Sequence, residues 1–318
     1  MAQASAIIGY GWRFVRAGTC SAAAMRYRFG RSHLLQYDLG MRRLLLALVF
    51  IPMTASVYAA LEANGQPARL LSAFFGLDNG LSFGANRICL GASGQDGMPI
   101  VLSHTIDSET LQPEDFRVFT RSGAERTPFC VTLRPATDTG EHRTVLLIGE
   151  FGDAANDPPV KVLVVDDLLS DGMTGDPVNF RGTETHVTPL DAGPALVLAE
   201  VVPKDEWSMP SRESACSAGT QQVVRATWAG GVRLPNGDNA GDAERALYRV
   251  IVERPDGSSN EIVPVALADL EDRDNNHLLC LDTSDPVVSV SFPAGHLVDP
   301  NRDLNPDTLI AVTQDRQR

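Results

Sequence analysis

The chain has 318 residues, 43% of them hydrophobic, and carries 27 basic against 40 acidic residues, for a net charge of −13. Such an acidic surface repels phosphate groups, which excludes a nucleic-acid partner and disfavours adhesion to anionic lipid. The sequence contains no P-loop and no dinucleotide fingerprint, so we expect neither a nucleotide nor an organic cofactor.

Residues 41–59 have the three-part layout of a secretory signal peptide. Met41–Arg43 form a positive head, Leu44–Met53 form an apolar run, and the small side chain of Ala59 ends a cleavage site. The run is shorter than the ~20 residues of a membrane-spanning helix, and no later segment reaches that length. We therefore predict an exported protein, periplasmic or secreted, with no membrane span once residues 41–59 are removed.

Forty residues precede Met41, although a signal peptide normally begins a chain. They are rich in arginine and poor in acids, as organelle transit peptides also are. Because a second targeting signal would be redundant there, we interpret residues 1–40 as an upstream segment that is not native. Translation would then start at Met41 or Met25. Without residues 1–59 the chain keeps 20 basic and 39 acidic residues, or −19.

Short runs rich in Val, Ile, Leu and Phe follow one another along the mature chain and predict strands. They are Met98–Ser103, Phe116–Thr120, Phe129–Leu133, Thr144–Ile148, Val160–Val165, Ala195–Val201, Gln222–Trp228, Leu247–Glu253, Glu261–Ala266, His277–Leu281, Val287–Phe292 and Thr308–Val312. Several alternate with period two, the mark of a half-buried strand. One predicted face carries Tyr248, Val250 and Val252 in this way. Another carries Val288, Val290 and Phe292.

Turn residues separate these runs, and helical signals are few. Arg254–Gly257 reads as the turn of a hairpin, while Glu109–Phe116 and Val265–Leu270 predict single helical turns. Many short strands with turns between them indicate an all-β fold with two antiparallel sandwich halves. Gly172–Pro194, rich in Gly, Thr, Asp and Pro, is the predicted linker. The predicted domains are accordingly residues 60–190 and 191–318.

Four cysteines remain after residue 59: Cys89, Cys130, Cys216 and Cys280. An even number in an exported chain indicates disulfides rather than a zinc site, since no C-x-x-C pair is present. Four cysteines allow three pairings, which sequence alone does not decide. Their division between the two halves favours Cys89–Cys130 and Cys216–Cys280.

Two stretches carry a resemblance to a family. Pro99–His104, Ile106–Leu111 and Glu114–Val118 follow the order of an apolar strand, a D-x-x-T-L turn and an F-x-V strand, and Leu297–Pro306 is similar to a closing D-x-x-G-N-P turn without its glycine. These two stretches resemble bacterial Ig-like domains. The resemblance implies a β-sandwich and no particular activity, because such domains serve as spacers, adhesins and enzyme appendages.

No catalytic signature is present in the sequence. There is no Gly-x-Ser-x-Gly elbow and no His-Glu-x-x-His, and the histidines are widely scattered. His277, close behind Asp274, and His296, close to Asp299, are the candidates for acid–base chemistry. For each of them, a structural histidine is the simpler interpretation.

Two segments are dense in side-chain oxygens. Asp299, Asn301, Asp303 and Asn305 occupy alternate positions, and Asp272 and Asp274 belong to an earlier acidic cluster. Calcium takes six to eight oxygen ligands, which alternating Asp and Asn residues can supply. The simpler interpretation is that these residues form turns. The sequence thus nominates these six residues as calcium ligands.

Three functions are compatible with these features. We expect a non-enzymatic binding or structural module with a protein or glycan ligand, because no catalytic motif accompanies the strands and cysteines. The first alternative is a secreted hydrolase, with or without calcium, that acts on an ester, lactone or glycan through carboxylates of the acidic clusters. The second is a subunit of an envelope assembly that docks through a sheet edge or an apolar patch. The oligomeric state is left open.

Overall fold

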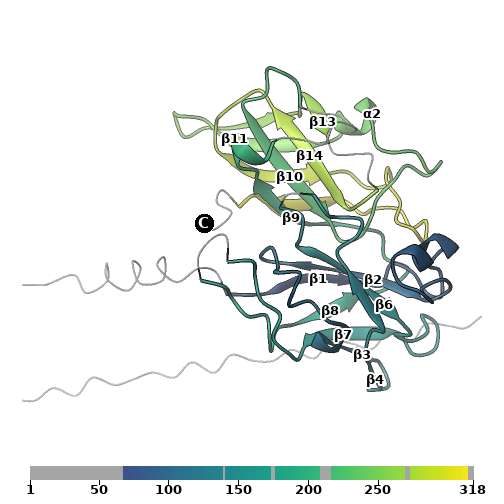
Figure 1. Cartoon of the computed structure of the whole chain (residues 1–318). Helices are drawn as coiled ribbons and strands as arrows, with labels where there is room; N and C mark the ends of the chain where they lie inside the picture. The colour runs from purple at the N-terminus through teal and green to yellow at the C-terminus, as the bar shows by residue number, and fades with distance from the viewer. Residues whose placement is uncertain (1–66, 139, 173–175, 208–215, 269–272, 314–318) are drawn as a thin grey trace, which may run out of the picture. The chain divides into compact units, whose positions relative to one another are not determined.

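The computed structural model describes residues 67–138, 140–172, 176–207, 216–268 and 273–313 (Figure 1). The fold is all-β, as predicted: the described residues form sixteen strands, and their helices are short. Those helices are η1 (Phe83–Arg87), η2 (Pro113–Asp115), η3 (Lys204–Glu206) and α2 (Asp242–Arg245). None of the helices in these ranges is long and apolar enough to cross a membrane.

The strands before residue 190 form one eight-stranded sheet. They are β1 (Leu70–Phe74), β2 (Asp96–Leu102), β3 (Phe116–Thr120), β4 (Glu125–Arg126), β5 (Cys130–Thr132), β6 (Thr144–Gly149), β7 (Pro159–Val164) and β8 (Glu184–Thr188). Their order is β4-β3-β7-β8-β1-β2-β6-β5, with β1 and β8 parallel and the other pairs antiparallel. Met98 and Leu147 pack with Phe116 and Val162 in one core, so the two ends of the sheet face each other.

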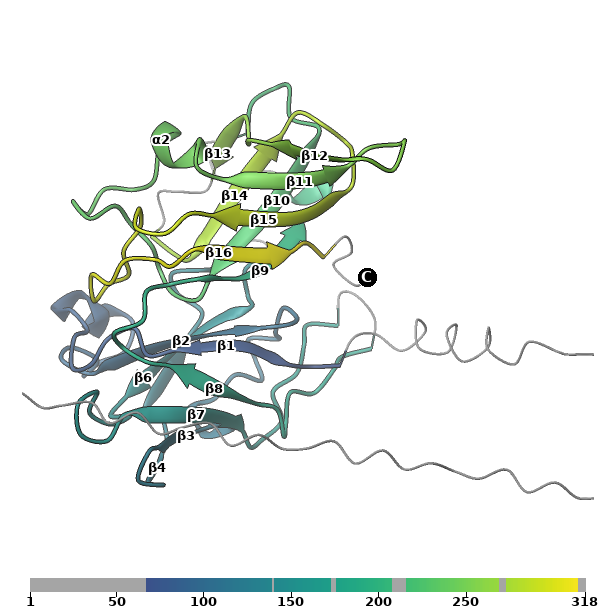
Figure 2. The ribbon, with the colours of Figure 1, turned by 180° about the vertical axis from the view of Figure 1, so that it is seen from behind.

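The strands after residue 190 form two four-stranded sheets (Figure 2). They are β9 (Leu196–Val201), β10 (Gln222–Trp228), β11 (Arg249–Glu253), β12 (Ser259–Ile262), β13 (Ala266–Ala268), β14 (Asn276–Leu281), β15 (Val287–Phe292) and β16 (Thr308–Ala311). One sheet has the order β13-β14-β10-β9 and the other β12-β11-β15-β16. Trp228, Tyr248 and Phe292 pack between them, fully buried.

Both halves have the same strand order. In the first half β5-β6-β2-β1 lies opposite β4-β3-β7-β8, and in the second β13-β14-β10-β9 lies opposite β12-β11-β15-β16. The first strand of each half also runs parallel to its last segment: β1 pairs with β8, and Glu200 of β9 bridges to Thr313 after β16. The sheets therefore divide on either side of residue 190, while the division into domains 60–190 and 191–318 stays a prediction.

The two disulfides occupy comparable places in the two halves. Cys89 is bonded to Cys130 and Cys216 to Cys280, the favoured pairing. In each pair the first cysteine lies between the first two strands of its half, and the second lies in β5 or β14, on the same sheet as those strands. Each crosslink closes a long loop and contributes about 4 kcal/mol in the loop-entropy account.

Three local expectations are wrong. β8 lies inside Gly172–Pro194, the predicted linker, because Val187 packs on the core of the first half. Val265–Leu270 contains strand β13 instead of a helical turn. Val288 is exposed and Val287 is buried in its place, because the register between β11 and β15 shifts there. The hairpin at Arg254–Gly257 is confirmed: it joins β11 to β12, and Gly257 has a φ of 80°.

Candidate functional site

His277 lies in the core of the second half. The Trp228 Nε1–H donates to the Tyr248 hydroxyl at 3.2 Å, and that hydroxyl lies 2.8 Å from His277 Nδ1. The direction of this second hydrogen bond depends on which ring nitrogen of His277 carries the proton. Burial lowers the pKa of His277 to about 4. This candidate for acid–base chemistry is therefore a neutral histidine buried in the core and hydrogen-bonded to Tyr248.

The other two catalytic candidates have different surroundings. The Asp274 carboxylate is buried and accepts from the Asn276 backbone N–H at 2.7 Å and from its side-chain amide. His296 is exposed, and its ring meets the edge of Phe292 at a centroid distance of 6.2 Å. The structure thus places His277 in the core and His296 on the surface.

The oxygen-rich segment at residues 299–305 is held by its own side chains. Asn305 Oδ1 accepts from the backbone N–H groups of His296 and Leu297, and its Nδ2 donates to the carbonyls of Pro293 and Pro306. That amide is consequently engaged on both atoms.

The remaining nominated ligands also form contacts within this segment. Asp299 Oδ1 accepts from the Asp303 backbone N–H at 2.8 Å, and Asn301 Nδ2 donates to Asp303 Oδ2 at 2.6 Å. Burial raises the pKa of Asp299 to about 6. Asp272 lies outside the described residues. Within the described ranges, no group of three or more His, Cys, Asp and Glu side chains could hold a metal ion, and calcium binding stays a prediction.

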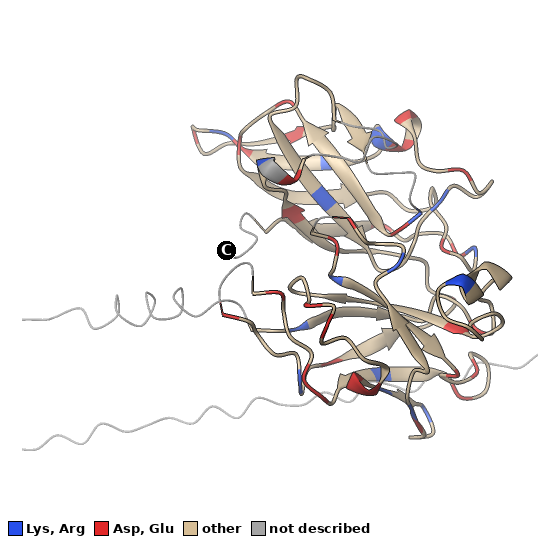
Figure 3. Cartoon of the chain, viewed as in Figure 1, with Lys and Arg blue, Asp and Glu red and all other residues tan. Residues whose placement is uncertain are grey.

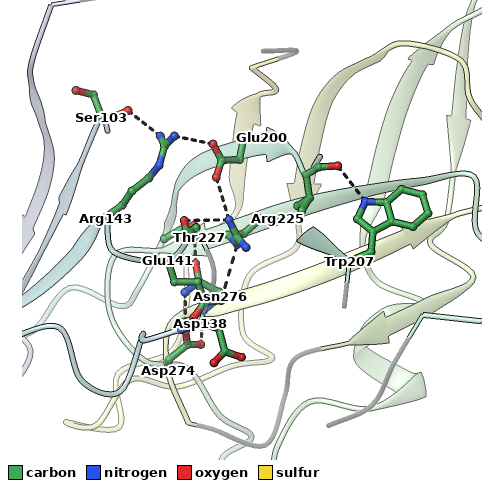
Figure 4. Close-up of polar contacts among 12 residues, drawn as sticks. Ser103, Asp138, Glu141, Arg143, Glu200, Trp207, Arg225, Thr227, Asp274 and Asn276 are labelled. Carbon is green, nitrogen blue, oxygen red and sulfur yellow. Dashed lines mark hydrogen bonds and ion pairs between the residues drawn. The ribbon is translucent and has the colours of Figure 1, made fainter. Parts of the chain in front are cut away.

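A buried cluster of charges joins the two halves (Figure 4). Arg225 and Glu200 face each other across β10 and β9, with Nη1 and Oε1 3.2 Å apart. Arg143 reaches the same carboxylate from the first half, with Nη2 and Oε2 3.0 Å apart. Arg225 in turn donates to the Gly140 carbonyl and lies 3.8 Å from a Glu141 oxygen.

All four charged side chains of this cluster are at least 90% buried. They balance, with two arginines against two glutamates, so the cluster carries no net charge. Removing one partner of such a buried pair costs about 3–5 kcal/mol, because its mate is left as an uncompensated buried charge. The cluster therefore fixes the contact between the halves.

An apolar cavity of about 160 Å³ lies beside this contact. The first half supplies Phe74, Leu77, Pro99 and Leu146 to its lining, and the second half supplies Gly230 and Gly231. Gly230 has no room for a side chain, since a Cβ there would approach the ring of Phe74 to 2.8 Å. The Gly230 backbone thus lies directly against the Phe74 ring at one end of the cavity.

A second cavity, of about 340 Å³, shares Gly231, Arg273 and Pro300 with the first. Its basic lining residues are Arg233, Arg273 and Arg302. We call the two together the groove, the first being the apolar cavity and the second the arginine cavity. Sequence reasoning missed these arginines because they are spread over 70 residues. The available signal was that Arg273 and Arg302 are the basic residues within the two acidic segments nominated for calcium.

A third pocket, of about 230 Å³, contains a Ser–His contact. Ser103 Oγ lies 2.9 Å from His104 Nδ1 and accepts from the Arg69 backbone N–H at the same distance. Burial, together with the nearby Arg143 and Arg69, lowers the pKa of His104. At neutral pH this histidine is consequently uncharged.

No family model matches the chain, and no curated protein matches it either. The resemblance to bacterial Ig-like domains therefore rests on the motifs in the sequence alone and stays a prediction.

Proposed function

We propose that the chain is an exported, non-enzymatic binding module whose two disulfide-stabilised halves together hold a ligand in the groove. The observation that carries the proposal is the apolar cavity, which takes its lining from both halves. Export is supported by the signal-like residues 41–59 and by the two disulfides, which form in oxidising compartments.

The contact between the halves favours a preformed cavity. The buried charge cluster holds β9 and β10 against residues 140–143, and Phe74 meets Gly230 at the cavity wall. A site formed by fixed parts binds with less loss of conformational entropy than one that must be ordered by its ligand. The groove is therefore suited to binding without a closing motion.

The lining of the apolar cavity favours a particular chemical group. Phe74, Leu77 and Leu146 offer carbon atoms rather than hydrogen-bond partners. A cavity of about 150 Å³ with such a lining can hold a benzene ring. Sugar hydroxyls would lose their hydrogen bonds to water there. Between the protein and glycan ligands expected from sequence, the cavity favours an apolar side chain of a protein.

A neutral aromatic probe tests this proposal. Benzyl alcohol, titrated into the purified protein, should shift the backbone NMR resonances of residues 74–77 and 230–231. Leu146→Trp fills the cavity and should abolish these shifts. Leu309→Trp, at a side chain that is 70% exposed, is the matched control and should retain them.

The result that overturns the proposal is equal shifts in Leu146→Trp and wild type, or no shift at the cavity in either. Melting curves of both variants accompany the titration, because a variant that fails to fold would lose its shifts for another reason. Leu146→Ile, which preserves the size of the side chain, should bind as wild type does.

The hydrolase alternative is favoured by one observation, the contact between Ser103 Oγ and His104 Nδ1 beside a 230 Å³ pocket. A neutral histidine at hydrogen-bond distance can take the proton of a serine nucleophile. Hydrolysis of p-nitrophenyl acetate that Ser103→Ala abolishes would support it. A rate equal to that of Ser93→Ala, at an exposed serine, would exclude Ser103 as the nucleophile.

A further inference from the structure

Three arginines from separate loops converge on the arginine cavity. Arg233 follows β10 and pairs with Val298 through two backbone hydrogen bonds. Arg273 immediately precedes the turn into β14, and Arg302 lies in the loop before β16. Loops far apart in the sequence thus supply positive charge to one cavity of about 340 Å³.

These guanidinium groups have donors to spare. Among the described residues, no carboxylate lies within ion-pair distance of Arg233, Arg273 or Arg302, and one hydrogen bond is made by their side chains, from Arg302 Nη2 to the Pro235 carbonyl at 3.1 Å. Each guanidinium carries five N–H donors. By contrast, Arg143 and Arg225 direct N–H donors to Glu200 in the buried charge cluster. The arginine cavity therefore offers unused donors to a ligand.

Backbone conformation sets two of these arginines apart. Arg273 has a φ of 71° and Arg302 a φ of 75°, in the left-handed region that favours glycine. The other described non-glycine residue there is Asn79, a type that tolerates this region. Strained backbone gathers at binding sites, where a particular side chain is needed at that position. Here both strained residues line the same cavity.

The charge of the groove is opposite to that of the chain. Acidic residues outnumber basic ones over the whole sequence, and Figure 3 shows both kinds spread over the ribbon. Among the residues that the structure describes, however, the groove is lined by four arginines, the fourth being Arg134, against Asp274 and Asp299. The Asp274 carboxylate is engaged by Asn276, and Asp299 Oδ1 by the Asp303 N–H. The net charge of these lining side chains is thus positive.

We propose that the arginine cavity binds the carboxylate of an organic acid whose apolar group enters the adjoining apolar cavity. Arg273 lines both cavities, so a short molecule can contact both at once. Guanidinium groups bind carboxylates through paired N–H donors in a fixed fork. A C-terminal residue with an apolar side chain and a free aromatic acid share this chemistry. The apolar half of the ligand rests on the proposed function, whereas the carboxylate half does not.

Phenylacetate and phenylacetamide form a matched pair of probes, since they differ in charge at one end. Calorimetric titration of the purified protein should give phenylacetate an affinity at least about tenfold higher, as expected for charged over neutral hydrogen bonds. Arg273→Gln should remove that advantage. Arg254→Gln, in the β11–β12 turn, is the charge-matched control and should leave it unchanged.

Arg273→Gly separates binding from folding. Glycine accepts a φ of 71° without strain, so this variant should melt at or above the temperature of the wild type while losing the preference for phenylacetate. Titrations with N-acetyl-Ala-Phe and with its C-terminal amide distinguish the two sources of the carboxylate, a protein chain terminus and a free acid. A peptide acid that binds more tightly than phenylacetate identifies a chain terminus, and one that binds more weakly identifies a free acid.

The proposal is overturned if phenylacetate binds no better than phenylacetamide, or if Arg273→Gln retains the preference. Inorganic phosphate tests the arginine cavity alone: it should shift the arginine Nε–H resonances of the wild type and leave those of Arg273→Gln in place. If phosphate does so while benzyl alcohol leaves residues 74–77 unshifted, the apolar cavity of the proposed function fails and the anion site stands.

Discussion

Burial shifts the pKa values of two core residues, His277 and Asp96, in opposite directions. The pKa of His277 is lowered from 6.5 to about 4, so folding requires the neutral ring. Its contribution to stability is full above pH 6.5 and is lost as the pH falls from about 6.5 toward 4. Asp96 acts oppositely: burial raises its pKa to about 6, and its contribution is lost as the pH rises from about 4 to 6.

We expect His277→Gln to reduce the loss of unfolding free energy between pH 6.5 and pH 4 by up to about 3 kcal/mol. The glutamine amide offers the Tyr248 hydroxyl a donor as well as an acceptor, but it takes up no proton. His296→Gln, at an exposed histidine, should keep the wild-type loss. Urea unfolding at a series of pH values measures the difference, and identical pH profiles for both variants would contradict the account.

Gly193 is a residue at which size alone decides the outcome. A Cβ at this position would overlap the carbonyl oxygen of Leu304, and backbone cannot move aside cheaply. We expect Gly193→Ala to destabilise the protein by about 1–3 kcal/mol. Gly219→Ala is the matched control, because a Cβ there meets no atom within 4 Å. Chemical denaturation compares the two, and equal midpoints would show that the 304 carbonyl yields.

At the scale of elements, alternation identified most strands but not all. Val250 and Val252 repeat with period two, and β3, β10 and β15 have the predicted bounds. The sequence pattern did not predict β1 and β8, because these two strands pair with each other across more than a hundred residues of the chain. In addition, β8 lies within Gly172–Pro194, whose many turn-forming residues predicted a linker and not a strand. Local pattern fixes a strand's face, whereas tertiary pairing decides whether a weak segment becomes a strand.

The candidate sites were less accessible to sequence reasoning. Cysteine positions predicted both disulfides, because each pair stays within one half. The arginine cavity depends on three loops meeting, which spacing along the chain does not encode. His277 attracted notice for its acidic neighbours, yet its strand position turned it into the core. Chemistry that lies within one segment can be predicted from sequence, and chemistry shared among loops requires the fold.

Melting curves can distinguish two ligands of opposite charge near the loop at residues 299–305, calcium and a carboxylate. If Asp299, Asn301 and Asp303 bind calcium in the folded state, added calcium must raise the melting temperature by mass action, and Asp303→Ala must remove most of the rise. Asp256→Ala, in a distant turn, should keep it. A melting temperature indifferent to both calcium and chelator would mean that the hydrogen bonds of this loop suffice. If phenylacetate raises the melting temperature and calcium does not, the loop belongs to the anion site.

At the scale of the whole molecule, the buried charge cluster should make the two halves unfold together. Glu200→Gln leaves Arg143 and Arg225 buried with one carboxylate fewer, at a cost of about 3–5 kcal/mol. We expect calorimetry to resolve two transitions in this variant where the wild type has one. Glu184→Gln removes an exposed pair with Lys161 and should cost at most about 1 kcal/mol. A single, unshifted transition in Glu200→Gln would show that the cluster does not couple the halves.

The parallel pairing of first and last strands gives each half a polarity. Because β1 and β8 run the same way, the chain enters the first half at one pole and leaves it at the other. Had they been antiparallel, the chain would return to its starting pole and need a long crossing to continue. Instead residues 189–195 suffice to reach β9, where the parallel bridge between Glu200 and Thr313 repeats the arrangement. Units that the chain enters and leaves at opposite ends can follow one another in series, and the linkers between them are short and therefore stiff.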